Sequence, residues 1–140
     1  MRESYAESVG NAVELLGMLG DGDPGSVKQL GLWLGRVVES LVNGQSPLAL
    51  VAMDLPADAL QRAALLATDA VGICGVLGRR MGLDPQQLMA LATAAAVHAC
   101  GLQRLPPPLM DELPDGLARA SSAFRRYPDL SAEMLKSCGG

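Results

Sequence analysis

The chain has 140 residues, of which 49% are hydrophobic and 19% are charged. This length allows one compact domain with a substantial core, and the apolar content excludes a disordered chain. The formal net charge of −4 gives no electrostatic basis for binding nucleic acid.

Helical spacing of apolar residues runs through the chain, and no segment shows the alternation of β-branched residues that is typical of strands. We therefore predict an all-α fold, a compact multi-helix bundle that forms a single domain over residues 1–140. The first helix has one apolar face and ends near residues 20–22, a Gly-Asp-Gly turn. That face is formed by Tyr5, Val9, Val13 and Leu16.

The second predicted helix begins at Asp23-Pro24, an N-cap residue followed by proline, and ends at Asn43-Gly44. Its apolar stripe has spacings of three and four residues, which suit either the protein core or a surface for a partner. The stripe consists of Val27, Leu30, Leu34, Val37 and Leu41, with Trp33 beside it.

The remaining elements are also helical. We predict helices over residues 46–53, 57–81, 88–100, 115–126 and 131–137. Gly82 ends the helix over 57–81. Asp84-Pro85 starts the following helix, whose residues 88–100 are apolar on nearly all sides, so that this should be the central buried helix. Gly101 is its expected end, residues 106–108 (three prolines) form an extended linker, and Tyr127-Pro128 separates the last two helices.

The cysteines and the hydropathy indicate the compartment. Cys74, Cys100 and Cys138 are odd in number and lack C-x-x-C spacing, so they are expected to be reduced thiols. The first ten residues lack the apolar core of a signal peptide, and the apolar run at 88–100 is shorter than the roughly 20 residues of a membrane span. We expect a cytoplasmic protein without membrane insertion.

His98 is the only histidine, and it lies among alanines within a predicted helix. No nucleophile-elbow sequence surrounds it, and the chain has no P-loop pattern. Taken alone, such a residue is expected to be a core histidine with one ring nitrogen hydrogen-bonded.

Four stretches resemble, in order and spacing, the HD-GYP domains, which are bacterial phosphohydrolases that cleave cyclic di-GMP. AAAVHACGLQRLPPPLM resembles their core segment, an apolar helix followed by H-D-x-G-K, a short turn and a proline. The residues in matching places are His98, Gly101, Leu105 and Pro106. The other three stretches are SPLALVAMDLPADAL from Ser46, LATDAVGICGVLGRRMGLD from Leu66 and RRYPDLSAEMLKS from Arg125. The resemblance implies N-terminal helices over residues 1–45 and an HD core over residues 46–140 that is short at its C-terminal end.

The departures from the family pattern affect the metal site. The resemblance places the first ligand histidine at Leu66, the paired aspartate at Ala99, the lysine at Leu102 and the histidine before proline at Tyr127. The family's later histidines and its G-Y-P motif have no counterpart before residue 140. Because a catalytic metal needs three or more protein donors, His98 is expected to be the remnant of a lost site, with no metal and no cofactor.

The resemblance therefore implies a catalytically inactive HD-GYP-like domain that acts as a protein-interaction or regulatory module in bacterial signal transduction. We expect a protein partner or a homodimer, and binding of cyclic di-GMP without cleavage stays open. One alternative is an HDOD-type non-catalytic signalling domain. Another is a metal-dependent phosphohydrolase with atypical ligands, or with a site completed by a partner chain.

Overall fold

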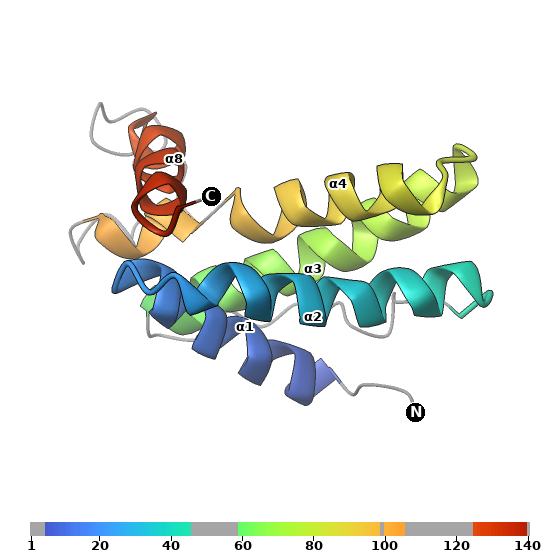
Figure 1. Cartoon of the computed structure of the whole chain (residues 1–140), viewed down its shortest axis with the longest axis horizontal. Coiled ribbons are helices and arrows are strands. Elements are labelled where there is room, and N and C mark those ends of the chain that lie inside the picture. The colour runs from blue at the N-terminus through green and yellow to red at the C-terminus, as the bar shows by residue number, and fades with distance from the viewer. Residues whose placement is uncertain (1–4, 46–58, 99, 106–124, 140) are drawn as a thin grey trace.

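A computed structural model describes residues 5–45, 59–98, 100–105 and 125–139. Every regular element in these residues is helical, and none is a strand, which confirms the all-α prediction. The elements are α1 (Tyr5–Gly20), α2 (Gly25–Val42), α3 (Ala59–Arg80), α4 (Pro85–Val97), the 3₁₀-helix η2 (Cys100–Arg104) and α8 (Tyr127–Ser137) (Figure 1).

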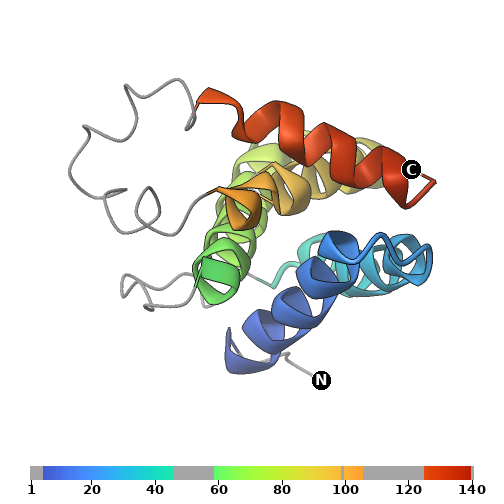
Figure 2. The ribbon, with the colours of Figure 1, turned by 90° about the vertical axis from the view of Figure 1, so that its left-hand side faces the viewer.

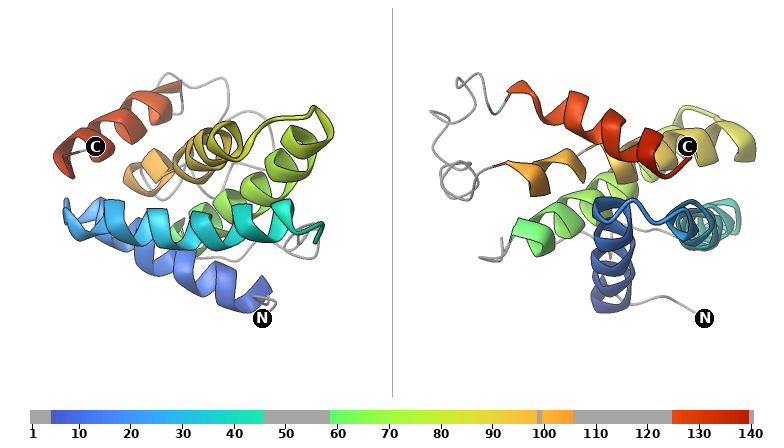
Figure 3. Two further views of the ribbon diagram at one scale, coloured as in Figure 1. Left: turned by 45° about the vertical axis from the view of Figure 1, so that its right-hand side comes forward. Right: turned by 60° about the vertical axis from the view of Figure 1, so that its left-hand side comes forward.

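The central helix of the bundle is α3. It packs against α1, α2, α4 and η2, whereas α8 packs mainly against η2 at one end (Figures 1 and 2). The prediction that residues 88–100 form the central buried helix is wrong. Helix α4 packs along one side of α3 (Figure 3). Its residues Ala90 and Ala94 are exposed. An alanine-rich sequence has no polar stripe, so its pattern does not show which side faces solvent.

Helix α2 ends where the sequence predicts but begins later. Its first residue is Gly25 and Pro24 is the N-cap, while Asp23 Oδ1 accepts a hydrogen bond of 2.8 Å from the Gly25 amide. At the other end Asn43 is the C-cap, and Gly44 has a φ of +80°, the left-handed conformation that glycine adopts without strain. The Asp23-Pro24 signal therefore locates the boundary, although the predicted N-cap residue is one position early.

The connection between α3 and α4 matches the sequence signals closely. Gly82 follows α3 with a φ of +78°. Asp84 and Gln87 then form a capping box, in which the Gln87 amide donates to Asp84 Oδ1 at 2.9 Å and the Asp84 amide donates to Gln87 Oε1 at 3.0 Å. These reciprocal bonds satisfy two amides that the first turn of α4 leaves without helical partners.

In the C-terminal third of the chain, the predicted end of one helix and the predicted start of another are wrong. Helix α4 ends at Val97 with His98 as its C-cap, so Gly101 is not the stop and instead lies within η2. Helix α8 starts at Tyr127 with Pro128 in its first turn, where proline needs no amide hydrogen bond. The predicted helix at 46–53, the proline linker at 106–108 and all but the last two residues of the helix at 115–126 fall outside the described residues.

The core lies between α1, α2, α3 and α4, and it also includes Met134 of α8 and Cys138, the C-cap residue of that helix. Most of the α2 stripe belongs to it: Leu30, Trp33, Leu34, Val37 and Leu41 are all buried. Only Val27 is exposed, at 44%. The stripe is therefore part of the core, and its interpretation as a partner-binding surface is corrected, since side chains enclosed by α1, α3 and α4 cannot contact another molecule.

Helix α3 is also long and apolar enough to cross a membrane by length and composition, over Leu60–Arg80 with a mean hydropathy of 1.4. A core helix of a soluble protein meets the same criterion, and 44% of this stretch is buried inside the bundle. The expectation of no membrane insertion stays a prediction.

Candidate functional site

Three of the positions that the resemblance assigns to a metal site lie close together in the structure. Leu66 of α3, Leu102 of η2 and Tyr127 of α8 belong to one small apolar cluster, separate from the main core. Leu105 and Leu130 complete it. We call these five residues the junction cluster, because α3, η2 and α8 meet there.

His98 lies next to this junction in the chain but is not a core residue. It is exposed, and its Nδ1 is 2.6 Å from the carbonyl oxygen of Ala95, one turn earlier in α4. The expected hydrogen bond to a backbone carbonyl is present, whereas the expected burial is wrong. The core side of α4 is formed by Ala92, Ala95 and Ala96, and the helical turn places residue 98 off that side.

Gly101 and Ser131 form the contact that joins η2 to α8. The Gly101 amide donates to Ser131 Oγ at 2.8 Å, and that hydroxyl lies within 3.1 Å of the His98 carbonyl oxygen and 3.0 Å of the Tyr127 carbonyl oxygen. A hydroxyl has one proton, so it donates to one of these carbonyls at a time. Sequence reasoning missed Ser131, whose only signal was its place in the stretch from Arg125 that resembles the family.

Glycine is required at position 101 because the backbone of α8 approaches it closely. A Cβ atom there would lie 2.6 Å from the Ser131 amide nitrogen and 2.8 Å from Ser131 Oγ, and it would also clash with the Tyr127 carbonyl oxygen. Backbone atoms cannot move aside as the end of a side chain can. Gly101 therefore allows α8 to cover the junction cluster.

The three cysteines are free thiols, as expected for reduced residues. Burial raises the pKa of the Cys100 thiol, which overcomes smaller opposing effects from Ser131 and Arg104. Its Sγ lies 3.8 Å from the Ser131 carbonyl oxygen. A buried thiol with a raised pKa is a poor nucleophile, so Cys100 acts as a small core residue.

The candidate metal donors do not converge within the described residues. No group of three or more histidine, cysteine, aspartate or glutamate side chains is placed there to hold a metal ion. Ala99, the position of the paired aspartate, lies outside the described residues. Of the described positions that the resemblance assigns to a metal site, Leu66, Leu102 and Tyr127 have apolar or aromatic side chains, and only His98 has a side chain that divalent metals commonly bind.

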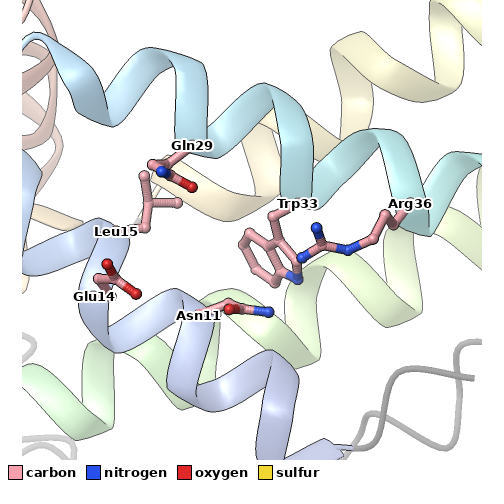
Figure 4. Close-up of a pocket in the computed structure, with 6 residues that line it drawn as sticks. All are labelled: Asn11, Glu14, Leu15, Gln29, Trp33 and Arg36. Atoms are coloured by element: carbon pink, nitrogen blue, oxygen red, sulfur yellow. The ribbon is translucent and has the colours of Figure 1, made fainter.

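A small hollow, which the sequence did not predict, lies between α1 and α2. Figure 4 shows Gln29, Trp33 and Arg36 reaching from α2 toward Asn11, Glu14 and Leu15 of α1. Its volume of about 20 Å³ suits one water molecule. Trp33 is 2% exposed, and its indole Nε1 has no hydrogen-bond partner in the described part of the chain.

Comparison with protein-family models, with curated proteins and with solved structures finds no match for this chain.

Proposed function

We propose that this chain is a catalytically inactive HD-GYP-like domain that serves as a protein-interaction or regulatory module in bacterial signal transduction. The junction cluster is the observation that supports this proposal. Leu66, Leu102 and Tyr127 are far apart in the sequence, yet they pack in one place, and the resemblance assigns all three to one metal site.

The chemistry of the cluster explains why catalysis would be lost. Hydrolysis of a phosphodiester by a metal enzyme needs a bound ion that activates water and neutralises phosphate charge. Leucine side chains provide no donor atom, and burying Leu102 and Leu105 against Tyr127 favours a closed apolar contact over a hydrated cavity. His98 alone supplies one imidazole, which is too few ligands to hold a catalytic metal.

The proposal is tested with the purified chain, incubated with cyclic di-GMP and Mn²⁺ or Fe²⁺ beside an active HD-GYP phosphodiesterase. We expect no linear or mononucleotide product and no stoichiometric metal in the purified protein. A mock purification from cells that lack this chain serves as the control for contaminating enzymes. Hydrolysis above that control, or one bound iron or manganese per chain, would refute the proposal.

A further inference from the structure

Helix α8 is attached to the bundle through few of its residues. Of its 11 residues only Ser131 and Met134 are buried, whereas Tyr127, Leu130 and Leu135 are half-buried and the others are exposed. It packs mainly against η2, which has five residues, and makes a small contact with α1. Helix α2, by comparison, has seven buried residues and packs against α1, α3 and α4.

Ser131 makes three polar contacts with one short stretch of the chain, residues 98–101. Its hydroxyl accepts a hydrogen bond of 2.8 Å from the Gly101 amide and lies 3.1 Å from the carbonyl oxygen of His98. Its own carbonyl oxygen lies 3.8 Å from Cys100 Sγ. Because these contacts meet at a single residue of α8, they form and break together.

The apolar contacts of α8 are divided between two places. Tyr127 and Leu130 belong to the junction cluster, and Met134 reaches the main core. The buried part of that core takes only Met134 and the C-cap residue Cys138 from this end of the chain, and its other members belong to α1–α4 and η2. The packing among α1, α2, α3 and α4 therefore does not depend on α8. Regions with few buried apolar contacts open at lower free energy than the core of the same protein.

We propose that α8 is a reversible cover of the junction cluster, which leaves the bundle as one unit while α1–α4 stay folded. Its departure breaks the contacts of Ser131 and uncovers Leu102 and Leu105, which are 4% and 6% exposed when α8 is in place. This conformational device goes beyond the proposed function. Hydrolysis and metal content do not test it, and the opening of α8 does not test catalytic inactivity.

The experiment measures amide hydrogen exchange of the full chain, residue by residue by NMR, at several low urea concentrations. The amides of Gly101 and Leu135 report on α8, and the amide of Val71, a fully buried residue of α3, reports on global unfolding. We expect Gly101 and Leu135 to exchange through one shared opening, with protection at least about tenfold lower than that of Val71. The opening should depend less on urea, because it exposes less surface than global unfolding.

Ser131→Ala tests the role of the hydroxyl. The substitution leaves the buried Gly101 amide without its acceptor in the closed state, so it should populate the open state at least about fivefold more. The readout is the amide of Leu135, because alanine at position 131 keeps the backbone carbonyl one turn earlier in α8. Unchanged protection of Leu135 in this variant would overturn the proposal.

Leu41→Val is the matched control. Leu41 is 1% exposed and lies against Gly75 of α3, at the end of the bundle opposite α8 (Figure 1). Loss of one methylene from this core should lower the protection of Val71 by roughly two- to tenfold. The protection of Leu135 should not change, because the core around Leu41 is intact both before and after α8 leaves.

Three results would contradict a separate opening of α8. The first is exchange of Gly101, Leu135 and Val71 in one transition with equal dependence on urea. The second is an equal effect of Leu41→Val on Leu135 and Val71, and the third is exchange of Gly101 and Leu135 through different openings. Circular dichroism verifies that each variant is folded, and the comparison within the wild-type chain stands without the variants.

Discussion

Replacing Gly101 by alanine tests the contact between η2 and α8. The added methyl would lie 2.6 Å from the Ser131 amide nitrogen and would clash with the Tyr127 carbonyl oxygen. Both are backbone atoms of α8, so the helix as a whole must shift. That shift would also lengthen the 2.8 Å hydrogen bond from the Gly101 amide to Ser131 Oγ.

The size of the effect follows from these two changes. Overpacking a well-packed site costs about 1–3 kcal/mol. Leaving a buried amide without its acceptor costs about 1–3 kcal/mol more. We therefore expect Gly101→Ala to lower the free energy of unfolding by about 2–6 kcal/mol, a large part of the 5–15 kcal/mol that is typical of a domain.

Urea unfolding, followed by circular dichroism and by Trp33 fluorescence, measures this loss. Gly31→Ala is the matched control, because its Cβ would meet nothing within 4 Å in an exposed part of α2. Alanine there should stabilise the protein by about 0.5–1 kcal/mol, since glycine is unfavourable inside a helix. Ser131→Ala removes the hydrogen bond without the clash and should cost less than Gly101→Ala. Equal effects of the two glycine substitutions would refute the reasoning.

Three further predictions use the same unfolding measurement. Leu34→Ala should lower the free energy of unfolding by about 2–5 kcal/mol because Leu34 is fully buried, whereas Val27→Ala should change it by no more than about 0.5 kcal/mol. Similar losses for the two variants would contradict the placement of the α2 stripe in the core. Asp84→Ala should cost about 0.5–2 kcal/mol by removing the capping box, so an unchanged unfolding midpoint would contradict that cap. Burial raises the pKa of the Cys100 thiol above its ordinary value of 9.0. The unfolded chain therefore releases this proton at a lower pH than the folded chain does. The stabilising contribution of the protonated thiol is complete below pH 9 and declines as the pH rises above it. Cys100→Ala should reduce that alkaline decline, and an identical pH profile would count against it.

The sequence predicted the burial and the contacts of the candidate site residues only in part. The resemblance assigned Leu66, Leu102 and Tyr127 to one site, and the fold brings these three side chains together. Sequence reasoning expected His98 in the core, but the residue is exposed at the end of α4. Ser131 was not recognised, because a serine on a helix gives no signal of a partner 30 residues away.

The sequence by itself determined the helices and several of their ends. Apolar spacing, the Asp84-Pro85 start and the glycines at 44 and 82 act through neighbouring residues, because capping and left-handed backbone are local effects. The beginning of α8 at Tyr127 shows the limit of such signals, since Pro128 is compatible with either a break or a first turn.

Only the tertiary structure decided which apolar faces are enclosed. Leu34 of α2 and Leu77 of α3 both belong to rows of apolar residues with helical spacing, yet Leu34 is fully buried while Leu77 is 54% exposed. Periodicity shows that a face is apolar, but burial depends on which helices pack against it, and those contacts join residues far apart in the chain. For this protein that difference separates the enclosed face of α2 from the exposed residues Ile73, Leu77 and Met81 at the C-terminal end of α3.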